Sequence, residues 1–146
     1  MVIKQLSVFL ENREGRLEKV TEALAENQIN IVSLSLADTS EYGMLRLIVS
    51  DPVKGKEILK DAGFSAMLTD VIAIKVPQKI GMMHQLLTVF AKEDLSVEYM
   101  YTLATGEFPS IIVKLNNAQK AIELLQAAGF ELFLAEQAYK INLDSL

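Results

Sequence analysis

A short polar loop near the start of the chain has the residue types of a small-molecule binding site. Asn12, Arg13 and Gly15 follow an alternating strand pattern and precede a helical one, so they stand where a helix begins. Free backbone N–H groups at a helix N-terminus bind anions, and a carboxylate fits well there. A carboxamide such as Asn12 can hold an ammonium or a carboxylate. The loop is a candidate ligand site, although a solvated turn relaxed by Gly15 would have a similar sequence.

Side chains that could perform catalysis are few. The chain has one histidine, His84, and no cysteine, which excludes disulfides, thiolate chemistry and cysteine-based zinc sites. No carboxylate pair, His-Glu metal spacing or glycine-rich phosphate motif stands out. His84 falls in the first turn of a predicted helix, where the positive helix end disfavours its protonated form. We interpret it as an exposed or ligand-adjacent neutral side chain, and we expect no enzyme activity, no cofactor and no metal.

Composition and charge exclude further classes of function. Of the 146 residues, 51% are hydrophobic, and the net charge is −5. A phosphate backbone repels a negative chain, so nucleic acid is not expected as a partner. The first residues lack a basic region followed by a long apolar stretch, and no transmembrane segment is visible. We therefore expect a cytoplasmic protein with no membrane partner.

The chain contains one pattern written twice, 66 positions apart. Gly15 corresponds to Gly81, and Ala62-Gly63-Phe64 corresponds to Ala128-Gly129-Phe130, with no gap between these anchors. A shared register over this length predicts two copies of one fold unit, which we place at residues 1–70 and 71–146. Units of about 70 residues are marginal alone, so each is expected to pack against another unit.

Hydrophobic periodicity gives the elements of the first copy. Alternating residues predict strands, and apolar residues three or four apart predict helices. Asp51 and Pro52 favour a helix start, and Gly63 favours a helix end. The predicted elements are a strand at Leu6–Leu10, a helix from Arg16 to Asn27-Gln28, strands at Val32–Leu36 and Met44–Val49, and a helix from Asp51-Pro52 to Gly63. Met44–Val49 is almost wholly apolar, which is typical of a central strand.

The second copy repeats the same order. Met83, Leu86, Leu87 and Phe90 are predicted to face inward from its first helix. The predicted elements are strands at Ile72–Val76, Leu95–Leu103 and Ser110–Leu115, helices at Met82–Lys92 and Asn117–Ala128, and a last strand within Leu132–Leu143.

Each copy therefore reads strand-helix-strand-strand-helix-strand. This order predicts an α+β fold of two ferredoxin-like βαββαβ units, each an antiparallel four-stranded sheet with two helices on one face. The stretch Ser65–Val76 must supply the last strand of one unit and the first strand of the next. Either a very short linker breaks at Asp70, or a strand is shared or swapped between the units.

Several short motifs resemble those of an ACT domain. They are Glu11-Asn12-Arg13-Glu14-Gly15-Arg16-Leu17, then Asn30-Ile31, then Tyr42-Gly43, and in the second copy Pro77-Gln78-Lys79-Ile80-Gly81. The first unit is most similar to the serine-sensing ACT domain of bacterial phosphoglycerate dehydrogenases. The whole chain is covered, so it resembles a free-standing tandem ACT protein with no catalytic domain attached.

The resemblance implies a function and an assembly. ACT domains pair side by side, joining their sheets, and bind small ligands, commonly amino acids, at the seam between units. The chain is then an amino-acid-sensing regulatory protein without catalysis, expected as a homodimer and as a partner of an enzyme of amino-acid metabolism. The alternative is an interaction module whose paired sheets mediate assembly with no ligand.

The resemblance also implies which residues touch the ligand. The loop of one unit faces the second strand of its neighbour, so Asn12 and Asn30 correspond to the two ligand-holding asparagines, and Gln78 and Ser96 are their counterparts. Glu14 replaces a proline of the relatives, which should loosen the loop. The remaining candidates are Arg13, Gly15, Arg16, Leu17, Ile31, Ser33, Lys79, Ile80, Gly81, Met82 and Tyr99. The two sites are expected to be unequal, and Ser33 and Tyr99 could equally be ordinary strand residues.

Overall fold

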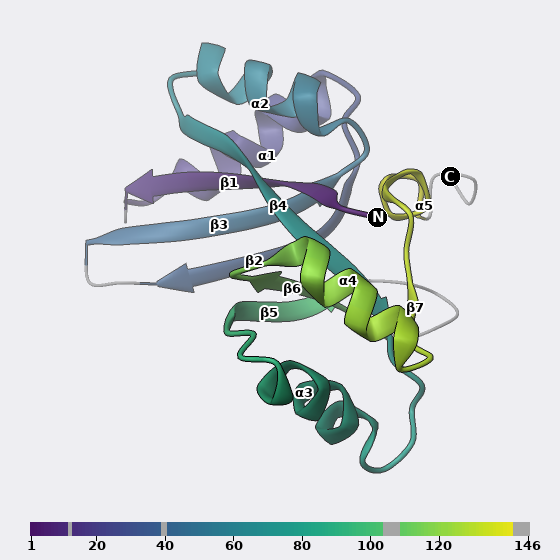
Figure 1. The fold of residues 1–146 in the computed structure, drawn as a ribbon. Helices are drawn as coiled ribbons and strands as arrows, with labels where there is room; N and C mark the ends of the chain where they lie inside the picture. Colours follow the sequence, from purple (N-terminus) through teal and green to yellow (C-terminus); the bar gives the residue numbers. More distant parts are fainter. Residues whose placement is uncertain (12, 39–40, 104–108, 142–146) are drawn as a thin grey trace. The chain divides into compact units, whose positions relative to one another are not determined.

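The chain forms two compact units. The computed structural model describes residues 1–11, 13–38, 41–103 and 109–141 (Figure 1). One unit, the N-terminal unit, contains Lys4–Thr69; the other, the C-terminal unit, contains Met1–Ile3 and the described residues from 70 to 141. No helix among the described residues is long and apolar enough to cross a membrane.

The N-terminal unit is a four-stranded sheet with two helices on one face (Figure 1). Its sheet has the strand order β2-β3-β1-β4, and β3 pairs antiparallel with both β1 and β2. The elements are β1 (Ile3–Glu11), α1 (Arg16–Glu26), β2 (Ile31–Asp38), β3 (Tyr42–Val49), α2 (Pro52–Asp61) and the first part of β4 (Ser65–Lys75). The predicted ferredoxin-like order is confirmed.

The core of this unit lies between the sheet and the helices. Leu6, Val8 and Leu10 alternate along β1 and are buried against α1, where Val20 and Leu24 form the buried stripe. Burying each such side chain contributes about 1.5–3 kcal/mol relative to exposure. The core fixes α1 against β1, and the loop between these two elements is thereby held at one end of the sheet.

The C-terminal unit has the same architecture. Its strand order is β5-β6-β4-β7, with β6 antiparallel to both β4 and β5. The elements after β4 are α3 (Met82–Lys92), β5 (Val97–Leu103), β6 (Ser110–Leu115), α4 (Ala118–Ala127), β7 (Glu131–Leu132) and a short helix α5 (Ala135–Tyr139).

The end of this unit differs from the prediction. A last strand was expected within Leu132–Leu143, but β7 has only two residues and pairs with the end of β4. The side-chain oxygen of Gln137 accepts a hydrogen bond from the backbone N–H of Leu134 at 2.9 Å, and α5 begins there. This bond, together with two alanines in a five-residue helix, favours helix over strand.

The buried face of α3 also differs from the prediction. Leu86 and Phe90 are buried as expected, but Met83 and Leu87 are 39% and 37% exposed. Met82 packs against the core instead, one turn before Leu86. The buried stripe therefore keeps Leu86 and Phe90 but includes Met82 in place of Met83 and Leu87.

Strand β4 belongs to both units. It runs without interruption from Ser65 to Lys75, and Asp70 is an exposed residue within it. It is hydrogen-bonded to β1, and Ile72–Lys75 in its second part pair with β6 and β7. Of the two alternatives for Ser65–Val76, one continuous strand is found in place of a linker.

The repeat extends to individual hydrogen bonds. The Asp51 carboxylate accepts from the Lys54 backbone N–H at 3.1 Å, which caps α2. The Asn117 carboxamide accepts from the Lys120 N–H at the same distance and caps α4. These pairs are 66 positions apart, as are the left-handed residues Gly63 and Gly129 that follow the helices, at φ +89° and +85°.

Candidate ligand-binding site

The loop between β1 and α1 leads into a helix whose N-terminus has no side-chain cap from the residues that the structure describes. Gly15 is the N-cap, in the left-handed conformation at φ +81°, and it offers no side chain to the first turn. In contrast, Asp51 caps α2. The same difference occurs in the C-terminal unit, where Gly81 begins α3 and Asn117 caps α4. The N-termini of α1 and α3 therefore keep backbone N–H groups for another acceptor.

A hollow lies beside the first of these helix starts. We call it the first loop hollow; it has a volume of about 200 Å³. Its wall comes from the end of β1, the loop, the start of α1 and the facing ends of β2 and β3. The lining residues are Leu10, Glu11, Arg13, Arg16, Leu17, Leu36 and Gly43.

Two arginines give this hollow its positive charge. The guanidinium of Arg16 lies over the ring of Phe64, with Cζ 4.4 Å from the ring centroid. Its Nε is buried and has no hydrogen-bond partner among the described residues. Buried donors in folded proteins are nearly always paired, so this atom is an open donor for an added acceptor. Arg13 is exposed and forms an ion pair with Glu11 at 2.9 Å.

The C-terminal unit has an equivalent hollow. We call it the second loop hollow; it has a volume of about 350 Å³. Each of the seven residues that line the first hollow has its counterpart, 66 positions later, among the lining residues of the second. These counterparts are Val76, Pro77, Lys79, Met82, Met83, Thr102 and Pro109, and Gln78, Leu103, Ser110 and Ile111 complete the wall. A hollow that recurs at the same positions of both units is a property of the repeated fold.

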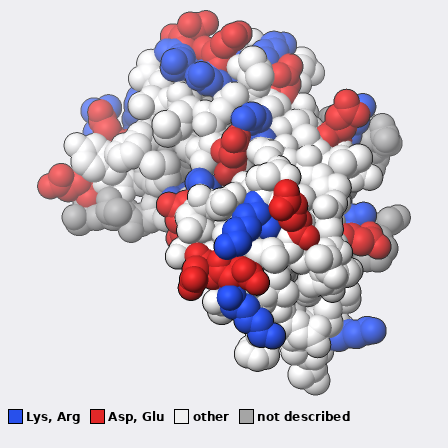
Figure 2. All heavy atoms as spheres, viewed as in Figure 1, with Lys and Arg blue, Asp and Glu red and all other residues white. Residues whose placement is uncertain are grey.

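The chemistry of the two hollows differs. Pro77 replaces Glu11, so the second hollow has no counterpart of the Arg13–Glu11 ion pair. Met82 replaces Arg16, and Lys79 is the one cation among the described residues of the second wall. On the face drawn in Figure 2, acidic and basic side chains are interspersed rather than gathered by sign. The lining residues therefore differ in charge between the two hollows.

The structure brings together part of the predicted site. Arg13, Arg16 and Leu17 line the first hollow, and Gln78, Lys79 and Met82 line the second. Glu14, Gly15, Ile80 and Gly81 lie in the loops and are exposed. Asn12 lies outside the described residues.

The second-strand candidates lie at the opposite end of the sheet from the loop of their own unit. Glu11 pairs with Tyr42 at the start of β3, whereas Ile31 pairs with Val49 at its end. Seven residues of strand separate these ends, roughly 23 Å. Asn30, Ile31 and Ser33 therefore cannot share a small ligand with the loop of the same unit. In the C-terminal unit, Ser96 and Tyr99 stand at the corresponding end.

The residues that begin the second strands have a structural role. The backbone N–H of Asn30 donates to the Ser50 hydroxyl at 2.9 Å, and the N–H of Ser96 donates to the Asn116 side-chain oxygen at 3.0 Å. Asparagine and serine have thus changed places between the equivalent positions of the two units, but the hydrogen bond from the backbone N–H to the side-chain oxygen is present in both. This bond ties the start of the second strand to the end of the third.

Other titratable groups stay outside the hollows. His84 is exposed on α3. A hydrogen bond and the charge of Glu22 raise the pKa of Lys19 above its usual value of 10.5, so Lys19 remains a cation at neutral pH. Among the described residues, no group of histidine, aspartate and glutamate could hold a metal ion.

Sequence reasoning missed the strand residues that close the hollows. Leu36 and Gly43, and their counterparts Thr102 and Pro109, reach the site because β2 and β3 turn back beside the loop. Tyr42-Gly43 forms a motif in the sequence, but strand register is what brings Gly43 beside the loop.

Comparison with known proteins agrees with this architecture. The family model described as an ACT domain pair matches residues 1–141. Protein BT0572 from Bacteroides thetaiotaomicron has a similar structure, at 40% identity and a TM-score of 0.91, over 97% of this chain and 98% of that one. No curated protein matches the chain.

More distant structures share the fold. The regulatory subunit of aspartate kinase from Thermus thermophilus, in its ligand-free form, is 18% identical, with a TM-score of 0.63 over 87% of this chain and 93% of that one. The corresponding subunit from Thermus flavus is 20% identical, with a TM-score of 0.57 over 87% and 94%. With a family model that matches nearly the whole chain and two βαββαβ units of the expected order, the chain belongs to the ACT domain pair family.

Proposed function

We propose that this protein is a regulatory module that binds an amino acid, or a similar small carboxylate, at its two loop hollows and performs no catalysis itself. The ligand-binding units are residues 1–70 and 71–146. The ligand would favour the conformation or assembly that binds it best, and an enzyme of amino-acid metabolism would respond.

The observation that carries this proposal is the recurrence of the hollow. Both units place a cavity beside a helix N-terminus that begins with a left-handed glycine, and both cap their other long helix with a side chain. A carboxylate would accept from the open N–H groups of α1 or α3 and gain from the helix dipole.

The cations of each hollow complement the same ligand. In the first hollow, Arg16 provides an open donor and Arg13 lies at the rim. In the second, Lys79 takes the place of Arg13. A hydrogen bond to a charged group contributes about 1.5–3 kcal/mol, which is enough to select a carboxylate over a neutral group.

The resemblance to known proteins supports a particular partner and ligand. Solved structures of the same fold include regulatory subunits of aspartate kinase, which supports an enzyme of amino-acid metabolism as the partner. The loop motif of the first unit makes serine the first ligand to test. That a neighbouring unit adds Asn30, or Ser96, to the bound ligand stays a prediction, as does a cytoplasmic location.

Substitution of Arg16 tests the first hollow. Isothermal titration of the wild-type protein and of Arg16→Ala with the amino acid that binds should show affinity reduced by about 1.5–3 kcal/mol, because a charge-assisted bond is lost. Lys19→Ala is the matched control, since this lysine lies on the same helix and pairs with Glu22 at 3.1 Å. Equal affinities in wild type and Arg16→Ala would remove the first hollow from the binding site.

A second function is favoured by the edge of the N-terminal unit. Strand β2 is the last strand on its side of this unit's sheet, and Leu34 and Leu36 on it are 51% and 48% exposed. Exposed apolar edge strands tend to pair with another chain. We therefore propose that the protein assembles as a homodimer, with or without ligand.

A further inference from the structure

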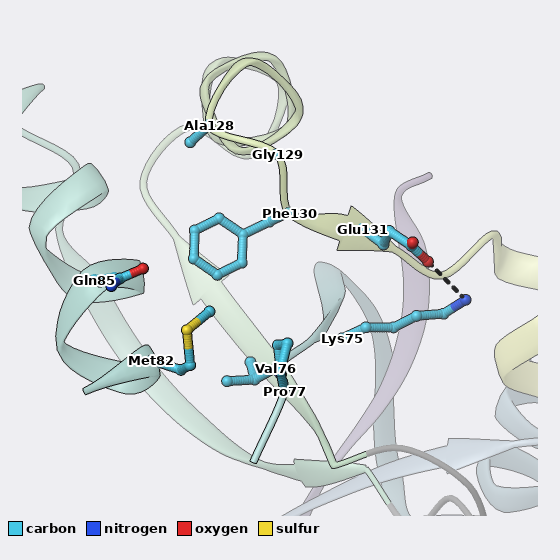
Figure 3. A pocket seen from close by; sticks show the side chains of 9 residues that line it. All are labelled: Lys75, Val76, Pro77, Met82, Gln85, Ala128, Gly129, Phe130 and Glu131. Carbon is cyan, nitrogen blue, oxygen red and sulfur yellow. Dashed lines mark hydrogen bonds and ion pairs between the residues drawn. The ribbon is translucent and has the colours of Figure 1, made fainter. Parts of the chain in front are cut away.

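The C-terminal unit contains a cavity that the loop hollows do not include. It has a volume of about 320 Å³, at the lower end of the range typical of ligand sites. It lies between the end of β4, the start of α3 and the turn from α4 to β7 (Figure 3). We call it the Phe130 pocket, and its apolar wall comes from Val76, Pro77, Met82 and Phe130.

The N-terminal unit shows what occupies this position when it is filled. The counterparts of Met82 and Phe130, 66 positions earlier, are Arg16 and Phe64. There the Arg16 guanidinium covers the Phe64 ring, with Cζ 4.4 Å from the centroid, and Phe64 is buried. In the C-terminal unit, the side chain of Met82 is shorter than that of Arg16, and Phe130 is only partly buried. The repeat thus contains one position filled by the chain's own side chain and one left open.

The open position suits an uncharged group. In Figure 3 the Phe130 ring and the Met82 thioether point into the cavity, whereas Lys75 and Glu131 extend away from it and pair with each other at 3.5 Å. Lys75 also lies 5.0 Å from the ring centroid of Phe133. Both charges are therefore directed elsewhere. The other described groups of the wall are aliphatic, aromatic and sulfur-containing, apart from the uncharged carboxamide of Gln85. Such a lining favours an apolar group the size of a side chain.

The Phe130 pocket adjoins the second loop hollow. The two cavities share Val76, Pro77 and Met82 as walls. A ligand whose carboxylate lies beside Lys79 and the start of α3 can therefore direct its other end along Met82 toward Phe130.

From this arrangement we infer that the C-terminal unit binds an amino acid with an apolar side chain, held by its carboxylate in the second loop hollow and by its side chain in the Phe130 pocket. This inference rests on the function proposed above and names the ligand class of one of its two sites. The N-terminal unit lacks such selectivity because Arg16 covers Phe64.

Substitution of Met82 by arginine, the residue at the equivalent position of the N-terminal unit, tests the inference. The variant Met82→Arg gives the C-terminal unit the side chain that covers phenylalanine in the N-terminal unit, and it should close the pocket without unfolding the protein. Leu87→Arg is the matched control, because it adds the same charge at an exposed position of α3. Thermal unfolding without ligand checks that both variants fold.

The measurement is isothermal titration with leucine, methionine and phenylalanine, and with serine and aspartate for comparison. We expect an apolar amino acid to bind the wild type and Leu87→Arg alike, and Met82→Arg to bind it about tenfold or more weakly. The methyl NMR signal of Met82 should shift on binding in labelled wild-type protein.

Four outcomes would overturn the inference. Apolar amino acids that bind Met82→Arg as tightly as wild type, or that leave the Met82 methyl signal unmoved, would place their side chains elsewhere. Binding of serine or aspartate alone would overturn the inference and leave the proposed function standing. If the folded protein binds none of the five amino acids, the inference is overturned, and so is the proposed function for these five ligands.

Discussion

At the scale of single residues, Arg16 and Met82 give the two loop hollows different chemistry at equivalent positions. Both residues begin a helix after a left-handed glycine, and both project toward a phenylalanine that follows the second helix of the unit. One is a cation with a buried, open donor; the other is a neutral thioether beside a cavity. Equivalent scaffolds thus present unequal ligand chemistry.

Asn12 offers a prediction at the same scale. Its carboxamide is expected to hold the charged head group of the ligand, so Asn12→Ala should weaken binding by roughly 1–3 kcal/mol. Titration calorimetry with the bound amino acid measures this loss. Gln119→Ala, which removes an exposed carboxamide from α4, should leave affinity unchanged. If both variants bind as tightly as wild type, the loop asparagine does not contact the ligand.

At the scale of elements, the helix caps should contribute equally in the two units. Asp51→Ala and Asn117→Ala each remove a side-chain oxygen that accepts from the third helical residue at 3.1 Å. Each change should lower the free energy of unfolding by about 1 kcal/mol. Urea denaturation checks this, with Glu57→Ala on the exposed face of α2 as the control. A loss no larger than that of Glu57→Ala would show that the caps contribute nothing.

The elements were largely predictable because local rules determine them. Gly63, Gly129, Asp51 and Asn117 stop or start helices through their own backbone preference or side-chain oxygen, and each does so in the structure. Residues that depend on three-dimensional neighbours were less predictable. On α3, periodicity predicts Leu86 and Phe90 on the buried face correctly but favours Met83 over Met82, because apolar residues occupy both positions and periodicity alone does not separate them.

The candidate site was only partly predictable for a related reason. The loop motif identified Arg13 and Arg16, since a helix start and a glycine can be recognised locally. Leu36 and Gly43 enter the hollow through strand register, which the sequence does not give directly. The Phe130 pocket depends on how close Met82 lies to a turn almost 50 positions later in the chain, which local patterns do not predict. The one sign of the pocket in the sequence is that Met82 replaces Arg16 at the equivalent position of the repeat.

At the scale of the whole molecule, the exposed edge of the N-terminal sheet predicts a homodimer. Sedimentation velocity at micromolar concentration should give the mass of two chains, and Leu34→Lys should shift the equilibrium toward one, because a charge on an edge strand opposes pairing. Val53→Lys places the same charge on an exposed position of α2 and serves as the control. A wild-type protein that sediments as a monomer would contradict the prediction.

The central claim is that this ACT domain pair binds amino acids. Thermal unfolding of the purified protein with each of the twenty amino acids at millimolar concentration tests it directly. A ligand present at one hundred times its dissociation constant should add about 2.7 kcal/mol of stability. We predict a raised midpoint with one or a few amino acids and none with the others. An unchanged midpoint with all twenty would contradict the claim and would favour a module that serves assembly alone.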